Sequence, residues 1–392
     1  MAEISANLDA TRKGKLYALL AAEPSGDLQA AALVPHIRER DPHASFIGIG
    51  GRRLRDAGVE ILCDTSCWGS IGPSEVVTRL PRIIFEYYRF RNEYAKRQPD
   101  VTVMIDSPAL FMRMAKFTKA KQLKTIYYFP PSAWSTSHRR MREIADRVTS
   151  VVSTFRRNFD TYRDAEVPVE YYGHPMVDVV PKRERSDSLK ELGLNEGRYV
   201  TLLPGSRLQE VRLMTPLLLE TARRLKAWDP NLHFLLPAAS PQVYEKLQSL
   251  CSDEVSLYNG KAQEMLSVSE LAIMTSGSVS LEAAFLNCPM VLGYRFNKID
   301  AALARFLIWI GLLKIKHFAL PNLVLDETIL PELLQEEVTP HRLFTEAQIL
   351  LKPGPAREKM LADLSRVQEA LGRGPVVSKV ADFVYRSAQG LE

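Results

Sequence analysis

Short apolar runs recur along the 392-residue chain, and each is followed by a stretch in which apolar residues return at helical spacing. Most runs end at Gly, Pro, Ser or Asp. Short strands that alternate with helices are typical of parallel sheets built from βαβ units. The expected strands are 16–22, 46–49, 101–105, 125–129 and 148–153, then 199–203, 233–237, 271–274 and 289–292.

The strand series runs twice, with a polar, Pro-containing break at 181–187. The length also favours two domains of somewhat under two hundred residues each. We therefore predict an α/β protein of two Rossmann-like parallel-sheet domains facing across a cleft, 1–180 and 181–354. Residues 355–392 are expected to be helical and to pack back on the first domain or on a partner subunit.

Ligands of such sheets bind at the carboxyl ends of the strands. Residues that directly follow an expected strand are therefore the first candidates for a site. They are 23–27, 106–108, 130–132, 204–207 and 276–278.

In the second half, Gly205, Ser206 and Arg207 follow a strand and precede a helix expected to begin near Glu210. A Gly turn at a helix start exposes backbone N–H groups to a phosphate, and an Arg adds a bidentate clamp. The alternative is an ordinary strand-to-helix turn with a surface Arg.

Ser276, Gly277 and Ser278 repeat this arrangement further along the chain. Small residues there would let a diphosphate approach the next helix, and Glu282, about one turn in, would accept hydrogen bonds from ribose hydroxyls. Glu282 as a plain first-turn acid is the alternative. Two anion-receptive helix starts in one half indicate a diphosphate, and hence a nucleotide-sugar.

Taken together, several segments resemble the lipid-A-disaccharide synthase family, whose members have the B-type glycosyltransferase fold. The similarity covers nearly the whole chain in the same order. The matching segments are 203–207, 210–211, 276–278 with 281–282, 288–291 with 293–295, 320–323 and 331–336. The resemblance implies that Arg207, Glu282, Asn322 and Gln335 line a UDP-sugar pocket.

In the first half, Asp106 ends the strand 101–105 and precedes Ser107-Pro108. Inverting sugar transfer needs a base that takes the proton of the attacking hydroxyl. A helix-capping Asp is the alternative from the residues alone. The resemblance implies that Asp106 is the base, with UDP-2,3-diacylglucosamine as donor and 2,3-diacylglucosamine 1-phosphate as acceptor. No cofactor and no metal are expected, because the chain has no Asp-x-Asp pair.

Other segments of the first half also match the family. Gly26 would allow a sugar or phosphate to approach, with Ser25 and Asp27 holding the loop; a helix-capping turn is the alternative. His174 is expected to touch the donor or to pack at the interdomain joint. The remaining acceptor or cleft candidates are Glu23, Ser132 and Trp134.

A basic cluster between Arg79 and Arg97 is interleaved with apolar and aromatic residues near helical spacing. Such a helix can lie in an anionic lipid interface, although its aliphatic residues are equally typical of a core. The resemblance favours the membrane, because the acceptor is a lipid. The expected membrane contacts are Leu80, Ile83, Ile84, Tyr87 and Tyr88.

The bulk composition adds few further restrictions. The formal charge is +5 and no nucleic-acid-binding motif is legible. The longest apolar runs fall far short of the roughly 20 residues of a spanning helix. We expect a cytoplasmic protein, peripheral on the inner face of the cytoplasmic membrane, and the resemblance allows a homodimer that exchanges C-terminal segments.

The acceptor half departs from the family at three places. Ala109 and Leu110 stand where an acidic residue and Phe are usual, Thr136 replaces a Trp, and Pro24 replaces a small residue. A relative with another acceptor, an enzyme like UDP-N-acetylglucosamine 2-epimerase and a non-catalytic nucleotide-sugar-binding protein are therefore the alternatives.

Overall fold

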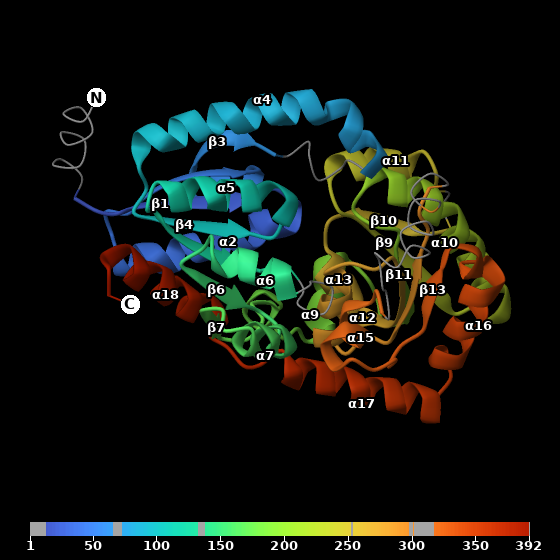
Figure 1. Cartoon of the computed structure of the whole chain (residues 1–392). Helices are drawn as coiled ribbons and strands as arrows, with labels where there is room; N and C mark the ends of the chain where they lie inside the picture. The colour runs from blue at the N-terminus through green and yellow to red at the C-terminus, as the bar shows by residue number, and fades with distance from the viewer. Residues whose placement is uncertain are drawn as a thin grey trace. The chain divides into compact units, whose positions relative to one another are not determined.

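The computed structural model describes residues 13–65, 73–131, 138–251, 254–297, 301 and 317–391, without the side chains of 73–83, 109, 138 and 139. The chain divides into two compact units (Figure 1). The first comprises Met1–Asp178 together with Gly372–Glu392, and the second comprises Val179–Leu371.

Within its described residues, the first unit contains a seven-stranded sheet of order β3-β2-β1-β4-β5-β6-β7, and every pairing is parallel. The strands are β1 (Leu16–Ala21), β2 (Ser45–Gly50), β3 (Glu60–Asp64), β4 (Val101–Ile105), β5 (Lys124–Tyr128), β6 (Ser150–Ser153) and β7 (Val169–Tyr171). The helices are α2 (Pro24–Arg40), α3 (Arg52–Asp56), α4 (Pro73–Arg97), α5 (Pro108–Ala120), α6 (His138–Ala145), α7 (Arg156–Asp164), α8 (Met176–Val179) and α18 (Val376–Gln389).

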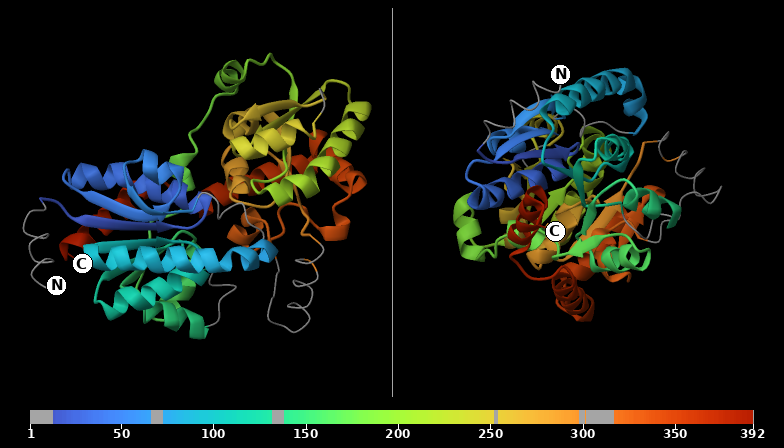
Figure 2. Two further views of the ribbon diagram at one scale, coloured as in Figure 1. Left: turned by 90° about the horizontal axis from the view of Figure 1, so that it is seen from above. Right: turned by 60° about the vertical axis from the view of Figure 1, so that its left-hand side comes forward.

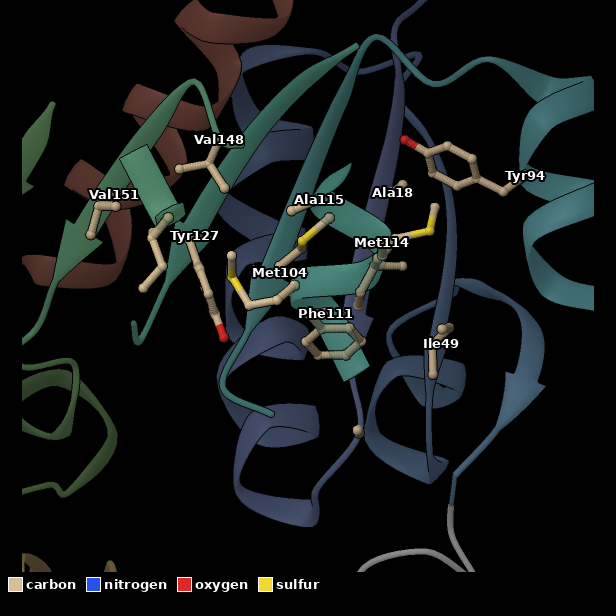
Figure 3. Close-up of a cluster of buried hydrophobic side chains, with 14 of the residues drawn as sticks. Ala18, Ile49, Tyr94, Met104, Phe111, Met114, Ala115, Tyr127, Val148 and Val151 are labelled. Carbon is tan, nitrogen blue, oxygen red and sulfur yellow. The ribbon is translucent and has the colours of Figure 1, made fainter. Parts of the chain in front are cut away.

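Strand β1 is buried on both faces, which explains its uninterrupted apolar sequence. Leu16, Ala18 and Leu20 enter one hydrophobic cluster, whereas the alternating residues enter the cluster on the opposite face. Figure 3 shows the first cluster, where Phe111 and Met114 of α5 lie against the sheet. The carboxyl end of the sheet is therefore fixed by packing from both sides.

Helix α18 returns to the first unit after the chain has completed the second. It lies along α2 in Figures 1 and 2, and its valines are buried in the cluster that α2 also supplies. The carboxylate of Asp178 accepts the N–H groups of Val376 (2.6 Å) and Val377 (2.7 Å), which caps the start of α18. Asp178 thus joins the segment that leaves the unit to the one that re-enters it.

In the described part of the second unit, a six-stranded parallel sheet has the order β10-β9-β8-β11-β12-β13. Its strands are β8 (Arg198–Leu203), β9 (Leu232–Ala238), β10 (Ser256–Asn259), β11 (Ser269–Met274), β12 (Met290–Tyr294) and β13 (Glu332–Leu334). Its helices are α9 (Arg185–Leu192), α10 (Leu208–Trp228), α11 (Pro241–Gln248), α12 (Ala262–Val268), α13 (Val279–Phe285), α15 (Leu320–Leu325), α16 (Pro340–Leu351) and α17 (Pro355–Ala370), with the 3-10 turn η2 (Gln335–Glu337).

The two Rossmann-like units confirm the predicted fold class, and all nine expected strands are present. Two details differ from the expectation. The second half of the polar stretch 181–187 already belongs to α9, and the segment 355–392 is divided, with α17 in the second unit and α18 in the first.

Candidate active site

The candidate residues lie where the order of strands reverses in each sheet. In the first unit β1 and β4 are neighbours, with Ala21 opposite Ile105, and they lead into 23–27 and Asp106. In the second unit β8 and β11 are neighbours, with Leu203 opposite Met274, and they lead into 204–207 and 276–278. Such topological switch points are where doubly wound sheets bind ligands.

Asp106 is placed by an unusual backbone conformation. It has φ +58° and Ser107 has φ +46°, so two consecutive non-glycine residues are left-handed. The hydroxyl of Tyr127 donates to the carbonyl of Asp106 (3.0 Å), and the Asp106 N–H donates to the Tyr128 carbonyl (3.3 Å). Strained residues of this kind cluster at functional sites. The side chain of Asp106 is half-buried.

The helix-capping alternative for Asp106 does not match the structure. Helix α5 begins at Pro108, and its N-cap residue is Ser107. Asp106 therefore lies one residue before the capping position.

The loop after β1 is largely absorbed into α2, which begins at Pro24 with Glu23 as N-cap. Gly26 is buried, and a Cβ there would make ordinary contacts, at 3.4 Å, with side chains of β1 and β4. Asp27 accepts the N–H groups of Gly51 (2.7 Å) and Arg53 (2.9 Å) and thereby holds the start of α3. Glu23 is half-buried and Ser25 is exposed.

His174 is packed inside the first unit. Its ring lies near Phe129 and Phe155, with centroids 5.6 and 5.0 Å away, and its Nδ1 accepts the Met176 N–H (3.1 Å). Burial lowers the pKa of His174 to about 3, so the ring is neutral and carries its proton on Nε2. This environment favours the packing alternative over a charged contact with the donor.

The turn after β8 differs from the expected open phosphate cradle. Helix α10 begins at Leu208, and Glu210 is its third residue. The Glu210 carboxylate accepts the N–H groups of Ser206 (3.1 Å) and Arg207 (3.3 Å). Gly205 has φ +115°, and a Cβ there would lie 2.3 Å from Glu210 Oε2, so glycine is required for the turn to close over this side chain. The N–H groups assigned to phosphate are therefore engaged by a carboxylate.

The turn after β11 is less closed. Ser276 donates to the carbonyl of Phe318 (2.7 Å), and no atom of the described residues would lie within 4 Å of a Cβ on Gly277. Ser278 is exposed and directly precedes α13. Glu282 lies in the first turn of that helix and accepts Gln263 Nε2 (2.9 Å). Among the described residues, these small side chains leave space above the turn, and the predicted approach of a diphosphate stays a prediction.

Asn322 is fully occupied by the protein itself. Its two amide N–H groups donate to Leu330 O (3.1 Å) and Glu332 Oε1 (2.9 Å). Its oxygen accepts the N–H groups of Ile329 (2.9 Å) and Leu330 (3.2 Å). A primary amide offers two donors and two acceptor sites, and all four are used. The expectation that Asn322 lines the pocket is therefore corrected: this side chain links α15 to β13.

Gln335 begins η2 with φ +54°, and its carbonyl accepts Arg295 Nε (3.1 Å). Its Nε2 atom is buried and has no hydrogen-bond partner among the described residues. Gln335 therefore has an unused donor beside the carboxyl ends of β12 and β13. Because leaving a buried amide unpaired is costly, a bound ligand that accepts this hydrogen bond would be favoured. This placement is compatible with the predicted role of Gln335 toward the donor.

The exposed apolar face of α4 includes two of the predicted residues, Ile84 and Tyr88, but not Tyr87. Tyr87 is 8% exposed and belongs to the core cluster, so it is removed from the expected membrane contacts. Phe85 (69%), Tyr88 (48%) and Ile84 (39%) are the exposed apolar residues. The Arg91 guanidinium lies 4.6 Å from the Tyr88 ring centre. Among the described residues, no helix has both the length and the apolar run needed to cross a bilayer.

Several predicted residues lie outside the described part of the structure. Ser132 and Trp134 fall in the gap before α6, and the side chains of Leu80 and Ile83 belong to the undescribed part of α4.

Comparison with known proteins decides the family. The family model described as lipid-A-disaccharide synthetase matches residues 17–379. The chain belongs to the lipid-A-disaccharide synthetase family. A lipid-A-disaccharide synthase of Myxococcus xanthus is 35% identical over 373 residues, covering 93% of this chain and 96% of that protein. The corresponding synthase of Geobacter sulfurreducens is 33% identical over 371 residues, covering 93% and 95%.

As a member of this family the chain is a glycosyltransferase, and the resemblance stated from the sequence is confirmed. Solved structures agree on the fold. A UDP-N-acetylglucosamine 2-epimerase of Neisseria meningitidis has a TM-score of 0.60 at 11% identity, covering 95% of this chain and 99% of that one. A calicheamicin glycosyltransferase has a TM-score of 0.58 at 11% identity, covering 97% and 99%.

The sequence assigned no role to three residues that organise the described site, although each lies in a segment that matches the family. They are Glu210, Tyr294 and Glu332. Glu210 is the third residue of α10, but Arg207 stands at the N-cap where the capping-box pattern has Ser or Thr, so the sequence carried no capping signal for it. Tyr294 and Glu332 become important only through contacts distant in sequence, which a single chain does not disclose.

Proposed function

We propose that the chain transfers 2,3-diacylglucosamine from its UDP derivative to the 6-hydroxyl of 2,3-diacylglucosamine 1-phosphate. The product is the β-1,6-linked lipid A disaccharide, and UDP is released. The observation that carries the proposal is the position of Asp106 and Arg207 at the switch points of the two sheets, in a chain of this family.

The proposed reaction is a single displacement. Asp106 accepts the proton of the acceptor hydroxyl, whose oxygen attacks the anomeric carbon of the donor. The bond from that carbon to the UDP oxygen breaks, so the configuration inverts and UDP leaves as an anion. Arg207, which is 39% exposed, would stabilise the departing charge.

The donor site is proposed around Arg207 and the turn at 276–278. The open space above Gly277 and the unused amide donor of Gln335 support it. Glu282 would meet the ribose hydroxyls. We propose that no divalent ion takes part, in keeping with a sequence that has no Asp-x-Asp pair. Turnover that is unchanged by excess EDTA would agree with this, and loss of turnover restored by Mg²⁺ would contradict it.

The lipid acceptor is proposed to be drawn from the inner face of the cytoplasmic membrane. Phe85 and Tyr88 on α4 are exposed apolar groups, and the Arg91 guanidinium lies over the Tyr88 ring, a combination suited to an anionic interface. Flotation with vesicles containing anionic lipid would test this. Phe85→Ser should weaken vesicle binding, and equal binding of the variant would count against α4. A homodimer stays a prediction, and light scattering, which measures the molar mass in solution, tests it.

The reaction is tested by mass spectrometry of the products formed from UDP-2,3-diacylglucosamine and a panel of lipid phosphates. A disaccharide monophosphate together with UDP is the expected result. UDP with an altered free sugar and no disaccharide would instead indicate an epimerase-like reaction.

A relative with another acceptor is the second candidate. The departures at Ala109-Leu110, Thr136 and Pro24 favour it, because all three places lie in the acceptor half. A disaccharide formed only with a different lipid phosphate of the panel would establish it. If no acceptor released UDP, the chain would be a nucleotide-sugar-binding protein.

A further inference from the structure

One buried carboxylate lies at the centre of the turn that carries Arg207. Glu210 is 9% exposed, and four groups donate to it. Its Oε2 accepts the N–H groups of Ser206 (3.1 Å) and Arg207 (3.3 Å). Its Oε1 accepts Arg207 Nη1 (3.4 Å) and the Tyr294 hydroxyl (3.0 Å). Both the backbone and the side chain of Arg207 are therefore tied to one acid.

Glu210 is unsuited to touching the donor itself. A carboxylate repels a diphosphate. The carboxylate of Glu210 is also covered by the turn at Gly205, which closes over it. The backbone N–H groups of Ser206 and Arg207 point to Glu210, so recognition of phosphate at this turn is left to the guanidinium. That group has five N–H donors in a rigid plane, so its orientation decides which of them face a ligand.

The hydroxyl of Tyr294, on β12, holds the Glu210 carboxylate in place through a hydrogen bond. Tyr294 is the last residue of β12 and pairs with Leu334 of β13. Burial, followed by the nearby Glu210, raises the pKa of Tyr294 to about 12, so its hydroxyl keeps its proton and donates to the carboxylate. The next residue, Arg295, donates to the carbonyl of Gln335 (3.1 Å). The turn after β8 is thereby connected to the ends of β12 and β13.

We infer that Glu210, held by Tyr294, is a positioning residue that orients Arg207 toward the diphosphate of the donor. The inference rests on the proposed donor site. It assigns Glu210 no contact with substrate, and its whole effect on binding passes through Arg207. A competing role, in which Glu210 occupies the place of a phosphate and is displaced by it, predicts the opposite effect of removing its charge.

Titration of the full-length protein with UDP measures this directly, in a double-mutant cycle of Glu210→Gln and Arg207→Ala. Loss of a hydrogen bond to a charged group corresponds to a change of about ten- to a hundredfold in affinity. Glu210→Gln should weaken UDP binding by about tenfold or more and raise KM for UDP-2,3-diacylglucosamine more than it lowers kcat. In the Arg207→Ala background the same change should have no further effect, because the group it orients is gone.

A matched control is Glu270→Gln. Glu270 pairs with Arg198 (2.7 Å) at the opposite end of the same strands, away from the donor turns. It should lower Tm without changing KM for the donor, which separates positioning from general loss of stability.

The outcomes are distinct. Unchanged or tighter UDP binding by Glu210→Gln overturns the inference, and so does equal weakening in both backgrounds, which would indicate a purely structural role. If Arg207→Ala itself leaves UDP binding unchanged, the proposed donor site fails and the inference fails with it. Should Glu210→Gln not fold, the same cycle with Tyr294→Phe, expected to weaken UDP by about three- to tenfold, replaces it.

Discussion

In the second unit, carboxylates at the switch point and on the edge strand β13 organise the backbone around them, whereas at the switch point of the first unit the backbone itself is bent. Glu210 gathers the turn after β8, and Glu332 accepts the N–H of Ala319 (2.8 Å) together with the Asn322 amide. Asp106 and Ser107 instead adopt consecutive left-handed conformations after β4. Residues near the proposed donor site are thus fixed by hydrogen bonds between side chains and backbone. The candidate base, Asp106, is instead positioned by its own backbone conformation.

This difference predicts how each site responds to substitution. Removing a network residue leaves several buried partners unsatisfied, so the cost appears as lost stability. Replacing a functional group on a fixed backbone leaves the scaffold intact, so the cost appears in the reaction rate. The expected effects below run from the largest to the smallest.

The largest effect is expected for Asp106→Asn. The amide cannot accept the acceptor proton, so turnover should fall by about 10²- to 10⁴-fold, the usual contribution of a general base. UDP affinity and Tm should stay near wild type, because the backbone conformation suits Asn as well as Asp. UDP release and calorimetry measure the two properties. Substantial residual turnover would remove Asp106 from the proposed mechanism.

Asn322→Ala tests the network of the second unit. The change leaves two backbone N–H groups, a backbone carbonyl and Glu332 without this partner, so the free energy of unfolding should fall by about 3 kcal/mol. Urea denaturation measures it. A loss of donor affinity with unchanged stability would instead restore the direct contact expected from the sequence.

His174 sharpens the contrast through pH. Its folded pKa of about 3 lies below the unfolded value of about 6.5, so the unfolded chain binds more protons as the pH falls. The contribution of His174 to the free energy of unfolding is constant above pH 6.5. Below pH 6.5 this contribution falls by about 1.4 kcal/mol per pH unit. Between pH 6.5 and 5 the free energy of unfolding of the wild type should fall by about 2 kcal/mol more than that of His174→Asn. Asn is chosen because its side chain keeps an acceptor for the Met176 N–H.

Parallel urea titrations of the two proteins provide the measurement. Identical pH profiles would show that His174 is not the buried neutral base described above.

The smallest effect concerns Ser107, whose φ of +46° is costly for a side chain with a Cβ. Ser107→Gly should raise the free energy of unfolding by up to about 1 kcal/mol, and Ser107→Val should lower it by about 1 to 2 kcal/mol. Differential scanning calorimetry distinguishes the pair. Equal stabilities would mean that the bend after β4 is not strained.

The fold was largely predictable because the central strands are apolar on both faces. The four strands that the sequence did not predict are β3, β7, β10 and β13, which have three to five residues and several polar side chains. All four lie at a sheet edge and are at least partly exposed, so alternation and hydrophobicity carry little signal there.

For the candidate site, the sequence anticipated which strand ends carry the candidate residues, but not their side-chain contacts. Strand ends located Asp106 and Arg207 because the chain order fixes which edge of a parallel sheet they reach. The sequence could not show that Glu210 already holds the turn or that the Asn322 amide is fully used, since both depend on side-chain geometry. On α4, helical spacing identified an apolar stripe, but packing against the sheet decided that Tyr87 points inward and Phe85 outward.

The return of α18 has a consequence for biosynthesis. Its valines fill part of the first unit's core, and Asp178 caps its first turn, yet it follows every helix of the second unit along the chain. While a ribosome is still translating, the second unit has its complete sequence before the first has. Until α18 is synthesised, one face of the N-terminal sheet is therefore partly uncovered. A holdase chaperone would bind that exposed face, and a chain terminated before α18 would leave it exposed permanently.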